Sequence, residues 1–298
     1  MLDFNKIRTY SIRDRKSKKK VSSFPDITTE PPKFDSPSLD LLVDAVVGAH
    51  KKRDMVILQC GGHVVKTGMS PYIIDLVKRG IITHLATNGS TSIHDFEIAM
   101  IGETSEDVGK SIEDGSFGMA EETGRFMNEA INASQEGYGL AIGRKIDSMD
   151  LPFKDRSLFY AAFKKGIPAT VHVAIGTDII HQHPSCDGAK IGAATYYDFK
   201  KYVESVAKLN GGVLINVGSA VILPEVFLKA LSIARNLGYD VRNITTANLD
   251  MINHYRPKMN VIKRPTSLGK QGLTVIGRHE ETIPNLYHKV MKRLGGVR

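Results

Sequence analysis

The feature that most constrains the fold of this chain is a series of short, continuously apolar segments that alternate with helical patterns. Residues 55–60 (MVILQC), 81–87 and 212–217 each form an apolar run without the polar alternation of a half-exposed strand. Strands that are buried on both faces, with helices between them, belong to parallel sheets. The sequence therefore predicts an α/β fold: a Rossmann-like parallel sheet with helices on both faces.

The remaining elements follow from the same patterns. Further strands are expected at residues 167–175, 240–246 and 273–276. Helices are expected at residues 38–50, 70–80, 157–165, 196–209, 224–237 and 280–294, and residues 92–133 read as mostly helical with breaks at Gly102 and around Gly115. Helix and strand patterns thus alternate along most of the chain.

The first 36 residues differ from the rest. The chain has a formal net charge of +8, and six of its basic residues lie between Arg13 and Lys20. Four prolines follow between Pro25 and Pro37. Such an arm either contacts nucleic acid or an acidic partner, or is a solvated, mobile segment. No aromatic residue interleaves the basic run, so bases have no platform for stacking and we expect no nucleic-acid partner. We expect an N-terminal arm at 1–36 and a single nucleotide-binding domain at 37–298.

Composition excludes several classes of protein. The 298 residues contain no apolar run of about 18, so no membrane span is expected, and the basic start lacks the apolar segment of a secretory signal. Cys60 and Cys186 are too few and too far apart for a disulfide scaffold. These features favour a cytoplasmic protein.

Small polar residues follow nearly every predicted strand. The clusters are Gly61-Gly62-His63 with Lys66-Thr67-Gly68, residues 87–92 with His94 and Asp95, Gly176-Thr177-Asp178, Gly218-Ser219-Ala220, and residues 245–248. Ligands of open α/β sheets bind beyond the carboxyl ends of the strands, where small residues let them approach the backbone. Each cluster alone is also ordinary turn or helix-cap chemistry, with Ser92 as one possible cap. Together they predict one shared ligand crevice.

The third cluster continues into a loop rich in titratable groups. His181, His183, Cys186 and Asp187 follow Asp178 within nine residues. These residue types can hold a metal, although their spacing matches no zinc motif. The alternative is a polar catalytic loop without metal, in which Asp178 accepts a hydroxyl or an amine and a histidine moves protons.

The order of these segments resembles the deoxyhypusine synthase family, from Gly61 to Pro284. The segments TGMSPYIIDLVKRGIITHLATNGS, SLFYAAFKKGIPATVHVAIGTDI and GGVLINVGSAVILPEVFLKALSIARNLGYDVRNITTAN are each similar to a stretch of that family. The resemblance implies a Rossmann-like fold that binds NAD. It also implies a homotetramer with NAD between paired subunits.

The resemblance also assigns residues. It places Thr67, Gly68, Asn88, Gly89, Asp95 (or His94), Gly218, Ser219, Thr246 and Ala247 near NAD, to which the turn chemistry adds Gly62. Asp178 corresponds to an aspartate that contacts NAD or an amine substrate. With His181 and His183, Asp178 forms the predicted catalytic set.

Two departures from the family pattern separate this chain from a true deoxyhypusine synthase. The position of the family's catalytic histidine falls at Leu223-Pro224, and the position of its imine-forming lysine falls at Thr274, with Lys270 before the strand. A Schiff base requires an amine fixed in the pocket. We therefore expect an NAD-dependent enzyme acting on a small polar or amine substrate. The alternatives are a metal-assisted hydrolase or lyase using the His181/His183 loop, and a non-catalytic nucleotide-binding regulator.

Overall fold

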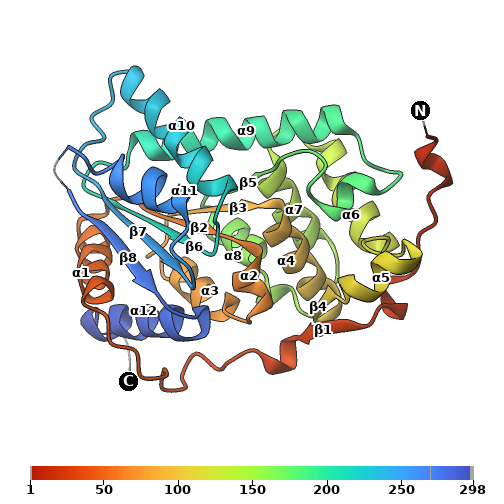
Figure 1. The fold of residues 1–298 in the computed structure, drawn as a ribbon, viewed down its shortest axis with the longest axis horizontal. Coiled ribbons are helices and arrows are strands. Elements are labelled where there is room, and N and C mark those ends of the chain that lie inside the picture. The colour runs from red at the N-terminus through yellow and green to blue at the C-terminus, as the bar shows by residue number, and fades with distance from the viewer. Residues whose placement is uncertain (1, 269, 296–298) are drawn as a thin grey trace.

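A six-stranded parallel sheet forms the centre of the protein in the computed structural model, which describes residues 2–268 and 270–295 (Figure 1). Its strands are β2 (Val56–Cys60), β3 (His84–Asn88), β5 (Ala169–His172), β6 (Val213–Val217), β7 (Thr245–Asp250) and β8 (Gly272–Ile276). They lie in the order β5-β3-β2-β6-β7-β8, and every neighbouring pair is parallel. The α/β fold predicted from the apolar runs is confirmed.

Helices cover both faces of this sheet because successive strand residues point to opposite sides. Leu58 and Ile215 share a core with α1 (Pro37–Lys52), α3 (Ser70–Lys78) and α12 (His279–Arg293). Ile57 and Leu214 face the other side, against α9 (Gly188–Ala207) and α10 (Ile222–Asn236). Burial on both faces explains why the strands lack polar alternation.

A second cluster of helices continues the molecule beyond β3 and β5. It comprises α4 (Gly89–Ile101), α6 (Glu121–Ala133), α7 (Tyr138–Ser148) and α8 (Leu158–Lys165), which enclose their own apolar core. Shorter helices are α2 (Gly62–Lys66), α5 (Val108–Asp114) and α11 (Tyr255–Pro257), the last running into a π-helical turn at Lys258–Lys263. Within the described residues, every helix is too short or too polar to cross a bilayer.

The N-terminal segment is not the solvated, mobile arm that its basic composition suggested. Its residues Ser17–Lys20 form β1, which pairs antiparallel with β4 (Glu103–Glu106) along one side of the molecule (Figure 1). Ile12 is 2% exposed within the helical cluster, and Arg15 is buried against Glu97. The lysines of the run are exposed, and Lys18 and Lys20 form surface ion pairs with Asp107 and Glu103, whereas Arg15 has a buried partner. The domain boundary at residue 37 stays a prediction.

Two element boundaries differ from the expected ones in a way that affects the site. Helix α4 begins at Gly89 rather than at residue 92, because the Asn88 side chain caps it by accepting from the Thr91 N–H at 3.0 Å. Strand β7 runs from Thr245 to Asp250, later than the expected 240–246. The polar residue Asn248 remains inside the sheet since its Oδ1 accepts from Asn216 Nδ2 at 2.7 Å.

Candidate functional site

The order of the strands reverses between β2 and β6, the two central strands. From β2 the chain continues to β3 and β5 on one side, and from β6 to β7 and β8 on the other. This is the arrangement in which a crevice opens beyond the carboxyl ends of the central strands. The turns that follow β2 and β6 are therefore the first place to look for a ligand site.

Backbone meets backbone at this reversal point. The Gly61 N–H donates to the Val217 carbonyl at 2.9 Å, and a β-carbon on Gly61 would lie 2.0 Å from the Gly218 carbonyl oxygen. Gly218 itself has a φ of 63°, in the left-handed region that favours glycine. Both glycines are required by packing.

The neighbouring turn after β3 joins the same edge. A β-carbon on Gly62 would lie 1.9 Å from Ser90 Oγ, and one on Gly89 would lie 1.9 Å from the Asp178 carboxylate. The contacts thus connect the turns after β2, β3, β5 and β6. The structure brings Gly62, Asn88, Gly89, Asp178 and Gly218, together with Ser219, to one edge of the sheet, as the clusters predicted.

Asp178 borders a cavity at this edge. The cavity has a volume of about 240 Å³, and its polar lining includes Lys66, Ser90, His94 and Thr177. The Asp178 side chain is only 7% exposed, and burial raises its pKa to about 6. Burial likewise lowers the pKa of His94 to about 4, so that this ring is neutral near pH 7. The lining also includes the Arg15–Glu97 ion pair and Glu106, so Asp178 is one of several charged or titratable groups at this cavity.

The two histidines of the loop have different environments. His181 Nδ1 accepts from the Gly176 and Asp178 N–H groups at 3.0 and 3.2 Å, which fixes the ring as the neutral Nε2–H tautomer. Its Nε2 lies 3.9 Å from Asp178 Oδ2. His183 points away toward α6, where its Nε2 lies 3.1 Å from Glu121 Oε2. Only His181 lies beside Asp178.

The loop does not assemble the metal centre that its composition made possible. Among the described residues, no group of three or more His, Cys, Asp or Glu side chains is arranged to hold a metal ion. His183 is held by Glu121 and Ser185 instead, and burial raises the pKa of the Cys186 thiol, which disfavours the thiolate that a metal requires.

Three residues expected near the cofactor lie elsewhere. Thr67 and Gly68 are at the far end of α2, where the Thr67 hydroxyl donates to the His63 carbonyl at 3.1 Å and Gly68 packs on Phe24. Asp95 caps α8, accepting from the N–H groups of residues 158 and 159 at 2.7 and 3.2 Å. A step of one residue turns a helix by about 100°, which separates Asp95 from the crevice that His94 faces.

Thr246 and Ala247 also lie away from the crevice, because β7 extends three residues beyond Ala247. The Thr246 hydroxyl donates to the Val261 carbonyl at 2.6 Å, and Ala247 is fully buried in the core. The carboxyl end of β7 is Asp250. The polar residues predicted to end the strand are instead buried within it.

The sequence patterns missed two residues of this edge. His279 opens α12 directly after β8, is 1% exposed, and would contact a β-carbon on Gly218 at 2.7 Å; its Nδ1 is buried without a hydrogen-bond partner among the described residues. Ser105 lines the Asp178 cavity with an unpartnered buried hydroxyl and a φ of 69°. A histidine shortly after a strand end was the available signal for His279; local sequence offered none for Ser105.

The position of the family's imine-forming lysine falls inside β8, and the nearest lysine precedes that strand. Thr274 occupies the middle of β8, in register with Asn248, and Lys270 precedes the strand. Since β8 runs parallel to its neighbours, Lys270 is at the amino end and the crevice is at the carboxyl end.

Comparison with solved structures returned several proteins of this architecture. A conserved putative LOR/SDH protein from Methanococcus maripaludis S2 matches 92% of this chain and 72% of its own, with 16% identity and a TM-score of 0.58. This chain therefore has the same fold as that protein. AgrE, in a ternary complex with ornithine and NAD⁺, matches 88% of this chain at 14% identity and a TM-score of 0.56. This chain spans 34% of AgrE and 32% of the related match ArgZ, an arginine dihydrolase from cyanobacteria.

The family named from the sequence is also among the matched structures. A putative deoxyhypusine synthase from Entamoeba histolytica matches 85% of this chain and 86% of its own, at 10% identity and a TM-score of 0.49. No protein-family model and no curated protein sequence matches the chain. The low identities show a shared fold and assign no substrate.

Proposed function

We propose that this chain binds NAD in the crevice between the turns after β2 and β6, and that it acts on a small polar substrate, an amine, in the cavity beside Asp178. The observation that carries the proposal is the reversal of strand order between β2 and β6, because open α/β sheets bind ligands beyond the carboxyl ends of the strands at such a point. The NAD⁺ bound by AgrE, a protein of the same fold, supports the choice of ligand.

The residues at the crevice fit a dinucleotide. In dinucleotide folds the pyrophosphate binds at the first strand-to-helix turn, which in this chain is Gly61-Gly62 after β2. The buried Nδ1 of His279, unpartnered within the described chain, can bond a ligand hydroxyl or phosphate. Asp178 covers the start of α4 at Gly89, so that this helix terminus is not open to an anion. NAD would supply a hydride acceptor.

Three residues of the loop after β5 would have different roles toward the substrate. Asp178, ionised above about pH 6, would bind and orient an amine. His181 does not line the cavity; it carries its proton on Nε2, 3.9 Å from Asp178 Oδ2, and would act on the substrate through that carboxylate. His183, engaged by Glu121, would hold the loop in place. Hydroxyls of Ser90 and Thr177 line the same cavity.

Calorimetric titration with NAD and NADH tests the cofactor. We expect saturable binding with a dissociation constant below about 1 mM. Gly62→Val should abolish binding, since its side chain would occupy the turn beside Ser90, whereas Gly192→Val, at an open position on α9, should leave it unchanged. Thermal melts of both variants verify folding. Failure of the wild type to bind either nucleotide would reject the proposal.

Turnover separates an enzyme from a binding protein. With NAD bound, a panel of small diamines and amino acids is scanned for formation of NADH by absorbance. Amine-dependent reduction that Asp178→Asn removes would support the catalytic assignment. NAD binding without reduction for any amine would favour the non-catalytic nucleotide-binding regulator.

We also propose that the chain assembles into a homo-oligomer, a tetramer. Large apolar side chains lie exposed after three neighbouring strands: Val221 (45%), Met251 (44%), Ile252 (61%), Tyr255 (68%) and Ile276 (47%). Exposed apolar residues grouped in this way are typical of protein interfaces. Light scattering at micromolar concentration tests this: a 32.8 kDa species would contradict it. The free Cys60 and Cys186 suit the reducing cytoplasm that we propose as its location.

A further inference from the structure

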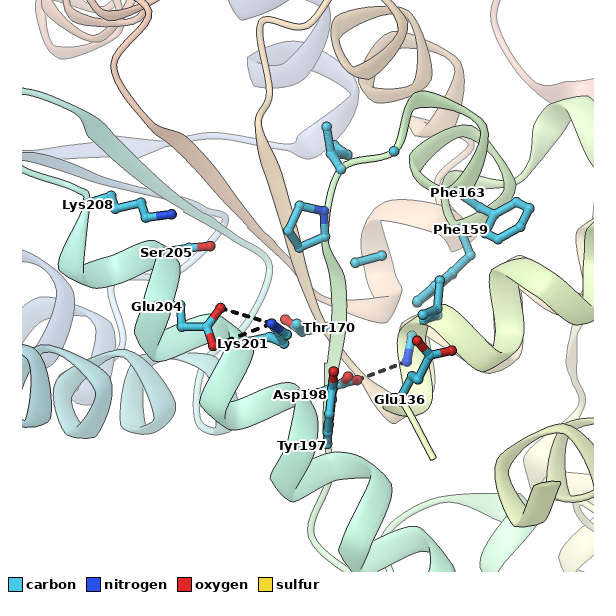
Figure 2. A pocket seen from close by; sticks show the side chains of 16 residues that line it. Glu136, Phe159, Phe163, Thr170, Tyr197, Asp198, Lys201, Glu204, Ser205 and Lys208 are labelled. Atoms are coloured by element: carbon cyan, nitrogen blue, oxygen red, sulfur yellow. Dashed lines mark hydrogen bonds and ion pairs between the residues drawn. The ribbon is translucent and has the colours of Figure 1, made fainter. Parts of the chain in front are cut away.

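A second cavity lies at the outer edge of the sheet, away from the crevice. It has a volume of about 500 Å³ and opens beside β5, the edge strand, between α9 on one side and α7 and α8 on the other (Figure 2). This volume is within the range of small-molecule sites. It shares no lining residue with the cavity beside Asp178.

The cavity exists because α9 covers only part of the strand edge. Asp198 Oδ2 accepts from the N–H groups of Val171 and Gly139 at 2.8 and 2.9 Å, and the Thr195 hydroxyl donates to the Val171 carbonyl at 2.8 Å. Burial raises the pKa of Asp198 to about 7. Two residues earlier in β5, the Ala169 N–H also points away from β3. It has no hydrogen-bond acceptor within the described chain and faces the cavity.

The two walls differ in chemistry. Figure 2 shows Phe159 and Phe163 on one side and the polar side chains of α9 on the other. Leu140 and Pro168 extend the apolar wall. A ligand that suits both walls has an apolar body and a polar head.

The charges on the polar side are mostly paired. Lys201 Nζ lies 3.1 Å from Glu204 Oε2, and Glu136 pairs with Arg144 at 2.7 Å. Two charged lining residues, Asp198 and Lys208, have no ion-pair partner in the described part of the chain. The Asp198 carboxyl is held by backbone N–H groups, so Lys208 is the charged group left to contact a ligand. The charge left for a ligand head is therefore positive, which selects an anion.

A chain of buried hydrogen bonds lies behind the polar wall. Ser205 Oγ is 2.7 Å from His84 Nδ1, His84 Nε2 is 3.0 Å from Thr170 Oγ1, and the same hydroxyl is 3.0 Å from His172 Nε2. Burial lowers the pKa of both histidines to about 3, so His84 stays neutral and is a poor base for activating Ser205. When His84 carries its proton on Nδ1, it donates to Ser205 Oγ, and the Ser205 hydroxyl proton is then free to donate into the cavity. The arrangement therefore suits binding and not acyl transfer.

We propose that this cavity binds a small monocarboxylate with an apolar body, its carboxylate toward Lys208 and Ser205 and its body against Phe159, Phe163 and Leu140. The site is separate from the proposed NAD crevice and does not depend on it.

Isothermal titration with 4-phenylbutyrate tests this, with 4-phenylbutylamine as the matched cationic probe. We expect 4-phenylbutyrate to bind with a dissociation constant below about 1 mM, unchanged by excess NAD, and 4-phenylbutylamine to bind at least tenfold more weakly. Lys208→Gln should weaken the binding of 4-phenylbutyrate about fivefold, which is the effect of losing one solvent-exposed ion pair. Lys200→Gln, on the same helix but outside the cavity, should leave it unchanged.

Leu140→Trp fills the cavity and should abolish binding, with a thermal melt to verify folding. The proposal is overturned by any of four results: no binding of 4-phenylbutyrate, equal or tighter binding of the amine, equal effects of the two lysine variants, or retention of binding by a folded Leu140→Trp protein.

Discussion

Arg15 and Glu97 form a bidentate ion pair, with Nη1–Oε1 and Nη2–Oε2 distances of 2.6 and 2.9 Å, although 82 residues separate them in the chain. Both side chains are almost wholly buried, at 3% and 1% exposure. Glu97 also accepts from the Thr104 and Thr123 hydroxyls at 2.6 and 3.0 Å. The N-terminal segment is thereby tied to α4, the helix that begins beside Asp178.

Arg15→Met should lower the free energy of unfolding by about 3–5 kcal/mol, because it leaves the Glu97 carboxylate buried without its cation. Urea denaturation at pH 7 measures this. Arg13→Met, an exposed change in the same segment, should alter stability by less than about 0.5 kcal/mol. The double variant Arg15→Met/Glu97→Met should recover most of the loss, since no unpaired charge remains. Equal effects of the two single arginine changes would show that the segment is not docked in solution.

The burial of Arg15 also shows where sequence reasoning reached its limit in the fold. The apolar runs were enough to predict the parallel sheet, because a strand that is buried on both faces has apolar residues at consecutive positions. The run from Arg13 to Lys20 is different, since its composition is that of a solvated arm and the partner of Arg15 lies in another element. A long-range ion pair leaves no local pattern.

Gly61→Ala should destabilise the protein by about 2–4 kcal/mol. Its β-carbon would meet the Gly218 carbonyl at 2.0 Å, and neither backbone can move without disturbing the central strands. Gly48→Ala is the matched control, because Gly48 lies in α1 with no atom within 4 Å of an added β-carbon. Alanine there should stabilise by about 0.5–1 kcal/mol through its higher helix propensity. Thermal or urea melts that shift in the same direction for both variants would contradict the close contact at the crevice.

The pH dependence of stability should report the buried carboxyl of Asp178. Its pKa is raised by burial from the ordinary 3.8 to about 6, so between these values the folded state binds more protons than the unfolded state. Stability contributed by the protonated group is therefore lost as pH rises from about 4 to 6. Asp178→Asn should be as stable as wild type near pH 4 and more stable by about 3 kcal/mol at pH 8, since one pKa unit corresponds to about 1.4 kcal/mol.

Urea denaturation across that pH range gives the comparison, with the exposed Asp150→Asn as control. Parallel curves for wild type and Asp178→Asn would mean that Asp178 titrates normally and is not buried as described. Because Asp95 and Asp198 also have raised pKa values, only the difference between wild type and variant isolates Asp178.

The sequence located residues correctly at one edge of the sheet where they follow strands, and misplaced them where side-chain direction decides; that any of them binds a ligand stays a prediction. Gly62, Asn88, Asp178 and Gly218 follow strands, and parallel strands end at one edge. Asp95 was assigned to the crevice although its partner is the start of α8, near Ser157. Helix rotation and partners far along the chain decide such cases, and neither is visible in a cluster of polar letters.

The last prediction is that this protein forms no lysine imine with an amine-derived group. Such chemistry needs an amine held in the pocket and desolvated, because an exposed lysine with a pKa of about 10.4 stays protonated at neutral pH. Thr274 occupies the middle of β8, and Lys270 precedes the strand, at the end of the sheet opposite the proposed NAD crevice. Leu223 and Pro224, at the expected histidine position, are buried in the first turn of α10. Incubation with NAD, spermidine and the protein acceptor of deoxyhypusine synthases, followed by borohydride reduction and peptide mapping, should therefore give no adduct, with an authentic deoxyhypusine synthase as positive control. A butylamine adduct trapped on Lys270 would require that lysine to reach the crevice and would overturn the assignment. No adduct together with saturable NAD binding is the result expected of a shared fold used for another substrate.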